Sequence, residues 1–181
     1  MKYIIFDLEA SCWQNTPKNF RQEIIEIGAY KLDDYGEILE QFQMFVRPVV
    51  HPILSSFCTN LTTIKQKEVD RAKGFLYVID ELYAWLDPDD EEYRFISWGI
   101  NDKHLLMNDA ELHKYDLNWL TQNYRDMKEA YNQIKKRNEP PGFMKALEME
   151  GISFIGQQHR ALNDAKHTVL LFLKHIDGWS F

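Results

Sequence analysis

The sequence predicts an α/β fold in which helices pack on the faces of a mixed β-sheet. Three short runs rich in β-branched and aromatic residues come first, with short polar connections between them. Helical periodicity then alternates with one further strand-like run. Consecutive strands with short turns form an antiparallel meander, whereas strands alternating with helices add parallel pairs. With 181 residues the chain is long enough to bury a core, and we expect a single domain spanning residues 1–181.

The first half of the chain supplies the strands of the expected meander. These strands cover residues 2–8, 23–31 and 40–46. Polar segments around Pro17 and Gly36 separate them, as turn residues do. Pro48 ends the third strand, because proline has no N–H for a ladder and restricts the residue before it.

The second half predicts helices around a further strand. Apolar residues at steps of three and four from Val69 to Leu86 indicate one amphipathic helix, which stops before Pro88. A strand is expected at residues 93–98. Further helices are expected at residues 102–113, in a stretch that ends at Lys136, at residues 143–150 and at residues 161–176.

Composition and charge exclude several classes of protein. The 21 Lys and Arg residues against 28 Asp and Glu give a net charge of −7, which argues against a histone-like or basic-tail binder. No apolar run approaches the ~20 residues that span a bilayer. The N-terminal apolar run stops at Asp7, too early for the core of a signal peptide. We therefore expect a cytoplasmic protein without a membrane segment.

Two carboxylates end the first expected strand. Asp7 and Glu9 are two residues apart, so in an extended chain both point to the same face. Their negative charges repel unless a cation lies between them, and carboxylate oxygens are preferred ligands of Mg²⁺ and Mn²⁺. A D-x-E pair alone is more often a solvated strand end.

Two further acids and a histidine occur at comparable places. Asp102 follows the apolar run at residues 95–97 and would by itself be read as a helix cap. Asp164 lies on an otherwise apolar helix, where a buried and unpaired carboxylate is costly. His159 comes five residues earlier, just before that helix.

Together these residues predict one chemistry. Four carboxylates share a pocket only with cations, and two divalent metals form a clamp for displacement at a phosphodiester. A neutral histidine beside that clamp can take a proton from an attacking water. The pattern therefore indicates a site for two divalent ions, Mg²⁺ or Mn²⁺, with a histidine base.

Three segments resemble, in order and spacing, the motifs of the DEDDh exonucleases, which remove nucleotides from 3′ ends. They read F-D-L-E-A-S from Phe6, S-W-G-I-N-D from Ser97 and H-R-A-L-N-D-A from His159. Residues 57–72 and 146–152 look like the histone-mRNA exonuclease branch, whose sporulation-inhibitor-like members are similar in size. The resemblance covers nearly the whole chain. It implies one exonuclease domain with a ribonuclease H-like fold, a mixed five-stranded sheet flanked by helices.

Carried over by position, the resemblance implies a role for each motif residue. Asp7 would bridge both metals. Glu9 and Asp164 would hold the metal that activates water. Asp102 would support the second metal, directly or through water. His159, next to the substrate, would be the general base.

The resemblance also implies contacts with the terminal nucleotide. In relatives the residues at Glu9 and Ala10 touch this nucleotide, and those near Phe57 and Leu61 flank its base. Asn101 departs from the pattern, because some relatives carry an aromatic residue there that stacks on the base. Stacking on an aromatic ring at this position is therefore not expected here.

The implied activity is 3′–5′ hydrolysis of single-stranded RNA or short oligonucleotides, with nucleoside 5′-monophosphates as products. RNA is favoured over DNA as the partner, but the sequence does not decide between them, because discrimination depends on whether a protein group meets the 2′-hydroxyl. A DNA-directed or proofreading-type exonuclease is the alternative enzyme, and a non-catalytic nucleic-acid-binding module is the alternative from another class. Basic clusters at residues 65–73 and 128–137 are either contacts for the strand or solvated helix faces. The sequence leaves the oligomeric state open.

Overall fold

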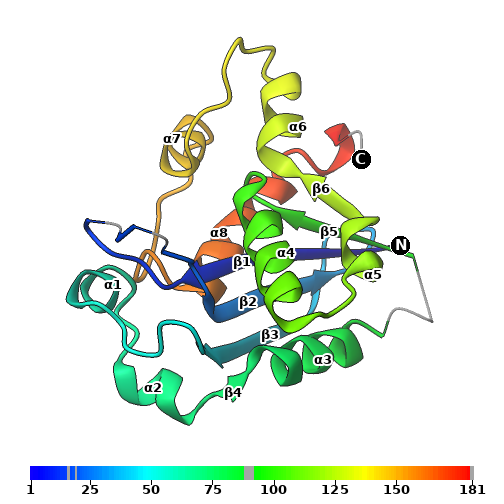
Figure 1. Ribbon diagram of the computed structural model, residues 1–181. Coiled ribbons are helices and arrows are strands. Elements are labelled where there is room, and N and C mark those ends of the chain that lie inside the picture. Colours follow the sequence, from blue (N-terminus) through cyan, green and yellow to red (C-terminus); the bar gives the residue numbers. More distant parts are fainter. Residues whose placement is uncertain (16, 19, 88–91, 180–181) are drawn as a thin grey trace.

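The expected mixed sheet is present, and it has six strands in the order β4-β3-β2-β1-β5-β6 (Figure 1). The computed structural model describes residues 1–15, 17–18, 20–87 and 92–179. The strands are β1 (Lys2–Ala10), β2 (Ile24–Leu32), β3 (Ile38–Arg47), β4 (Lys73–Gly74), β5 (Tyr93–Ser97) and β6 (Tyr124–Asp126). Antiparallel pairs join β1 to β2 and β2 to β3, as the predicted meander requires. The pairs β1–β5, β5–β6 and β3–β4 are parallel.

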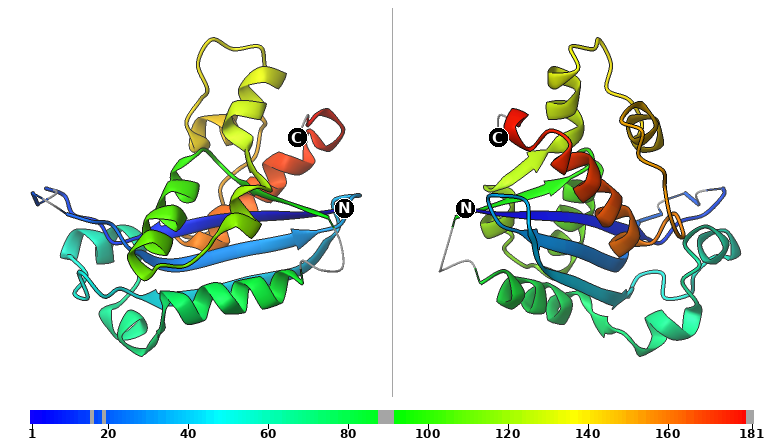
Figure 2. Two further views of the ribbon diagram at one scale, coloured as in Figure 1. Left: turned by 45° about the vertical axis from the view of Figure 1, so that its right-hand side comes forward. Right: turned by 180° about the vertical axis from the view of Figure 1, so that it is seen from behind.

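Helices cover both faces of this sheet (Figure 2). They are α1 (Ser56–Thr62), α2 (Gln66–Arg71), α3 (Phe75–Leu86), α4 (Asn101–His113), α5 (Asn118–Thr121), α6 (Met127–Ile134), α7 (Phe143–Met149) and α8 (Ala161–Leu173), with a 3₁₀ turn at Ile176–Gly178. The longest have 13 residues. Across the described ranges, no helix combines the length and apolar character needed to cross a membrane.

Two details of the sequence prediction differ from the structure. The sheet has six strands rather than five, because residues 73–74 add a short parallel pair to the end of β3. The single helix expected from Val69 to Leu86 is instead two helices, since Ala72 and Gly74 take extended backbone angles. The apolar spacing continues through this break because Val69 and the α3 residues bury against different parts of the core. The spacing therefore could not reveal the break.

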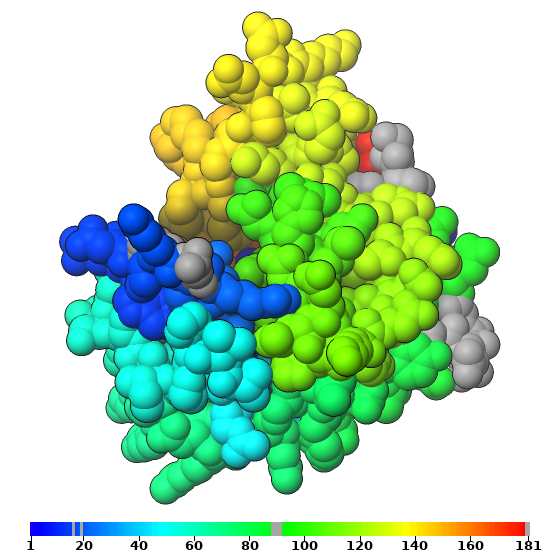
Figure 3. Space-filling model, viewed as in Figure 1, coloured from blue at the N-terminus to red at the C-terminus, as the bar shows by residue number. Residues whose placement is uncertain are grey.

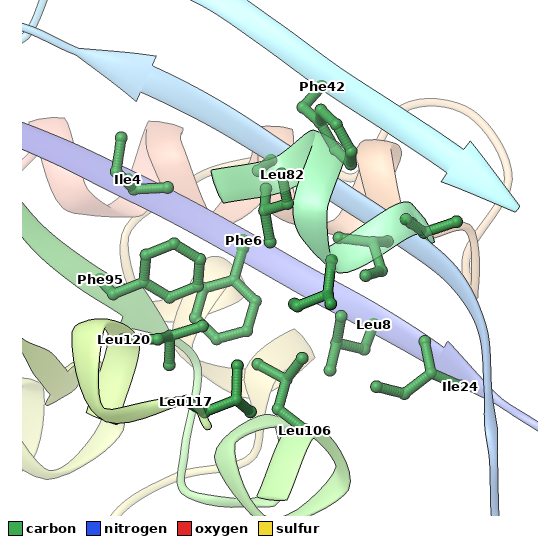
Figure 4. Packing of buried hydrophobic residues seen from close by; sticks show 14 of the residues in the cluster. Ile4, Phe6, Leu8, Ile24, Phe42, Leu82, Phe95, Leu106, Leu117 and Leu120 are labelled. Atoms are coloured by element: carbon green, nitrogen blue, oxygen red, sulfur yellow. The ribbon is translucent and has the colours of Figure 1, made fainter. Parts of the chain in front are cut away.

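Alternation along β1 divides the core between the two faces. Ile4, Phe6 and Leu8 belong to the cluster under α3, α4 and α5, which Figure 4 shows closely packed. Ile5 points the other way, into the cluster formed with α6, α7 and α8. Because residues two apart share a face, Asp7 and Glu9 continue the Ile5 side. The strand thus presents its acids toward α8.

Gly28 allows α8 to begin directly on the sheet. It lies in β2, paired with Asp7 of β1. A Cβ atom on Gly28 would lie 2.2 Å from the backbone nitrogen of Leu162 and 2.4 Å from the carbonyl carbon of Ala161. Real Cβ atoms do not approach backbone so closely, and the first turn of α8 cannot yield without moving away. The helix therefore reaches the sheet only because residue 28 has no side chain.

Replacing Gly28 with alanine should consequently displace the start of α8. We expect Gly28→Ala to lower the free energy of unfolding by about 3 kcal/mol, the upper part of the range for overpacking in a core. Urea unfolding measures this loss. Gly74→Ala is the matched control, because a Cβ there meets nothing within 4 Å. Equal stability of the two variants would contradict this account.

Candidate active site

Asp102 joins the acids of β1 from a different element. It occupies the first turn of α4, directly after β5, and is 9% exposed. The Ser97 side chain and the backbone of Leu8 lie near enough to its carboxylate to lower its pKa, against the larger effect of burial. The nearness of Leu8 places the start of α4 beside β1, between Asp7 and Glu9. Residue 102 therefore meets residues 7 and 9 at the carboxyl end of β1, although it lies far from them in the sequence.

Asp164 and His159 complete the group from α8 and the segment before it, on the face of the sheet opposite α4. The ligand atoms of Glu9, His159 and Asp164 all lie within 4.8 Å of one another. The backbone N–H of His159 donates to Oδ2 of Asp164 at 3.0 Å. His159 has a positive φ of 58° and an exposed side chain, whereas Glu9 is 7% exposed. The exposed imidazole of His159 thus lies beside the buried carboxylate of Glu9 and the half-buried carboxylate of Asp164.

The segment that carries His159 is fastened to α8. The Asn163 side-chain amide donates to the carbonyls of Ile155 and Gln157 at 3.2 and 2.7 Å. Nε2 of His167 accepts from the backbone N–H of Ile155 at 3.0 Å, and its other ring nitrogen lies 2.8 Å from the Asn163 carbonyl. His159 is therefore positioned by α8, the helix that it precedes. Sequence reasoning missed this role of Asn163 and His167.

Glu26 is a fifth carboxylate beside the four motif acids, and Arg160 already neutralises its charge. It has 0% exposure and lies opposite Glu9 in the β1–β2 register. Arg160 donates to it through Nε at 3.0 Å and Nη2 at 2.9 Å, and the N–H of Ala161 donates at 3.1 Å. Glu26 thereby caps the start of α8 and pairs with Arg160. Its sequence signal was an acid inside the mostly apolar strand β2, all of whose residues are buried.

The surroundings raise the carboxyl pKa values at this site. Burial is the main cause at Glu9, whose pKa rises to about 8, with Asp164 and Glu26 adding to it. Burial likewise raises the pKa of Asp102 to about 7 and that of Asp164 to about 6, and Asp126 contributes at Asp102. The pKa of Asp7 is well above its usual value, through burial and then through Asp102, Asp164 and Glu9.

This donor set fits divalent cations. The acids are crowded enough to raise one another's pKa, and a cation between them would reverse that cost. Oxygen ligands suit hard ions such as Mg²⁺ and Mn²⁺. Within the described chain, Glu9, His159 and Asp164 form the tight group, and Asp7 and Asp102 adjoin it electrostatically. These five residues are the ones that sequence reasoning selected.

A hollow opens beside the carboxylates (Figure 3). Its volume is about 420 Å³, and Glu9, Ala10, Leu61 and Asn101 line it, as do His104 and Leu105 of α4, which sequence reasoning missed. Phe57 lies on α1 with Leu61 and is 39% exposed, but it is not among the described lining residues. Leu61 and Asn101 therefore face the hollow, and the expected contact of Phe57 with the base stays a prediction.

A smaller hollow of about 210 Å³ lies on the other flank of Asn101. Trp98 and Lys128 line it, so one lysine of the second basic cluster reaches the site. Lys135 of the same cluster is instead paired with Glu150, with 2.6 Å between Nζ and Oε1. The cluster thus divides between a position at the site and an ordinary ion pair.

The chain is similar in sequence to known exonucleases. A family model described as Exonuclease matches residues 4–172. ERI1 exoribonuclease 2 of Homo sapiens is 32% identical over 197 residues, covering 97% of this chain and 28% of that protein. The 3′-5′ exoribonuclease 1 of Rattus norvegicus is 30% identical over 182 residues, covering 96% and 53% respectively. The chain therefore spans between about a quarter and a half of these relatives' length.

Solved structures show the same fold. The nuclease domain of 3′hExo, described as a DEDDh family member bound to rAMP, superposes with a TM-score of 0.89 at 27% identity. The superposition covers 97% of this chain and 92% of that one. The mixed α/β architecture predicted from the sequence is confirmed by this likeness.

The raised pKa values predict that the metal-free site destabilises the protein. An unfolded aspartate titrates near pH 4, so a higher folded pKa lowers the free energy of unfolding progressively as pH rises above about 4. We expect metal-free Asp7→Asn to melt several degrees above the parent at pH 8 and by less at pH 5. Each ~1 kcal/mol shifts Tm by roughly 2–4 °C at this size.

Calorimetry with and without Mn²⁺ checks this expectation. Bound ions should raise the Tm of the parent protein, and they should raise the Tm of the variant by less. The reason is that the charge of Asp7 interacts with those of Asp102, Asp164, Glu9 and Glu26. A metal-free variant that melts at or below the parent at pH 8 would show that the carboxylates are not in conflict.

Proposed function

The chain belongs to the exonuclease family, and from this premise we propose that residues 1–181 form one exonuclease domain of the histone-mRNA exonuclease branch. It hydrolyses phosphodiester bonds at the 3′ end of single-stranded RNA or short oligonucleotides and releases nucleoside 5′-monophosphates. The observation that carries this proposal is the meeting of four carboxylates and an exposed histidine beside an open hollow. The names of the relatives support RNA as the substrate.

Divalent ions are the cofactors that this site suits, and we assign two of them, Mg²⁺ or Mn²⁺. Asp7 would contact both, Glu9 and Asp164 would hold one, and Asp102 would hold the other. When bound, such ions polarise water and neutralise charge on the scissile phosphate. The protein contributes a rigid set of oxygens, because Asp102 lies beside Leu8 of β1 and Asp164 lies on the helix docked against Gly28.

His159 is the group suited to take the proton from the attacking water. Its ring is exposed, and a ring nitrogen lies within 4.8 Å of a carboxylate oxygen of Glu9 and of Asp164. Its backbone N–H donates a hydrogen bond to Asp164. The water oxygen bonds to phosphorus as the bond to the upstream 3′-oxygen breaks. That oxygen leaves as the new 3′-hydroxyl of the shortened strand.

The terminal nucleoside fits the 420 Å³ hollow. Glu9 and Ala10 border its sugar, and Leu61 offers an apolar side to its base. Asn101 replaces the stacking ring of some relatives with an amide, which can bond to a base edge or a sugar hydroxyl. Single strands suit such a site, because a terminal nucleotide enters it without unpairing.

The direct test is incubation of a 5′-labelled single-stranded RNA with Mg²⁺ or Mn²⁺, with a chelator lane beside it. We expect a ladder of shortened strands in the metal lanes and intact RNA with chelator. The same tube with a DNA strand of equal sequence separates the two enzyme readings, because faster loss of DNA would favour a DNA-directed exonuclease. Intact strands in every lane would favour a non-catalytic binding module.

Removal of the imidazole tests the general base. His159→Ala should lower the rate by ~10²–10⁴-fold, the usual contribution of proton transfer. The rise in Tm on adding Mn²⁺ should largely persist, because the four carboxylates remain. His113→Ala, at the far end of α4, is the matched control and should retain activity. Near-normal turnover of the His159 variant would remove this residue from the mechanism.

A further inference from the structure

A second large hollow has no part in the proposed reaction. Its volume is about 720 Å³, and it lies between residues 12–13 and 20–22 on one side and α4 on the other. Trp13, Phe20 and Arg21 line the first side, and Asn108 and Glu111 line the side of α4. Such a space is large enough for a further nucleotide beside the 420 Å³ hollow.

The lining has the composition of a nucleotide site. The rings of Trp13 and Phe20 lie 4.3 Å apart at 63°, and His51 packs 5.0 Å from Phe20, so the aromatic wall is braced from behind. Aromatic walls stack on any base, because every base has a π-face. Asn108 and Gln22 add side-chain amides, which match the donors and acceptors of a base edge.

Arg21 adds a cation to this wall. Its guanidinium donates to the Asn108 carbonyl and lies 3.9 Å from Glu111, a long ion pair. Its Nε is buried without a hydrogen-bond partner among the described residues. A phosphate oxygen is the usual partner of a guanidinium in nucleic-acid sites.

The hollow continues the place assigned to the terminal nucleoside. The two spaces share Cys12, Gln22 and Asn108. Neither space includes His159 or Asp164, which line a separate hollow under α7. A strand that runs from the carboxylates through the 420 Å³ hollow therefore reaches the larger space next. On that path the occupant of the larger space lies on the 3′ side of the bond that is cut.

We propose that this hollow binds a second nucleotide on the product side, so that the enzyme also releases dinucleotides. The inference rests on the proposed exonuclease function. With the strand advanced by one nucleotide, the penultimate nucleoside fills the 420 Å³ hollow and the last base packs into the corner between the rings of Trp13 and Phe20. Water adds to the phosphorus, the bond to the upstream 3′-oxygen breaks, and that oxygen gains a proton. The product is a dinucleotide with a 5′-phosphate.

A strand with a blocked last link tests this proposal. An RNA whose final internucleotide link is a methylphosphonate, which this hydrolysis does not cut, can be shortened only at the next link. We expect the parent enzyme to release the 5′-phosphorylated dinucleotide, identified by mass spectrometry. Trp13→Ala and Phe20→Ala should each slow this release at least ~10-fold, since stacking on one aromatic ring is lost. Both variants should still cut an unmodified strand.

Controls separate the inference from the function on which it rests. Trp13→Phe keeps a ring and should restore dinucleotide release, and Tyr35→Ala, 84% exposed on the β2–β3 turn, should change nothing. Cleavage of the unmodified strand with no dinucleotide from the blocked strand would overturn the inference and leave the exonuclease function standing. Dinucleotide release that Trp13→Ala and Phe20→Ala do not slow would also overturn it. Failure on both strands would overturn the function itself.

Discussion

The docking of α8 on β2 is the contact on which the site depends. Gly28 lets the first turn of the helix touch the sheet, and Glu26 fixes that turn by accepting the N–H of Ala161 and both donors of Arg160. Both residues lie opposite the acids of β1, at Asp7 and Glu9. One helix end, closed down on one pair of strands, thus brings the third motif onto the first.

The same docking creates the electrostatic conflict that the site needs. Asp164 is carried toward Glu9, and both lose solvent, so their pKa values rise. The conflict is tolerated because the large apolar clusters on the two faces of the sheet hold the elements in place. The crowded acids lower the free energy of unfolding of the metal-free protein, and they favour the binding of cations. Functional sites commonly combine these two properties. Arg160 offsets Glu26, so the charges left for cations belong to the motif acids.

The position of the site at the carboxyl end of β1 also explains its openness. Strand β1 has β2 on one side and β5 on the other, and α4 starts just beyond β5. Helices α4 and α1 and residues 12–13 and 20–22 therefore lie around the end of β1 and line two open hollows there. Loops and helix ends can vary there while the sheet keeps the acids fixed.

The sequence by itself predicted the fold class and the meander, and it selected five residues that the structure brings together at the end of β1. Strand alternation fixed the shared face of Asp7 and Glu9, and the motifs identified Asp102, His159 and Asp164. Only the tertiary structure decided the break between α2 and α3, the short strands β4 and β6, and the position of Phe57 outside the hollow. It also revealed Glu26, Asn163 and His167, which act through partners distant in the chain or in loops. Periodicity records which way a side chain points, whereas its partner is set by how separate elements pack.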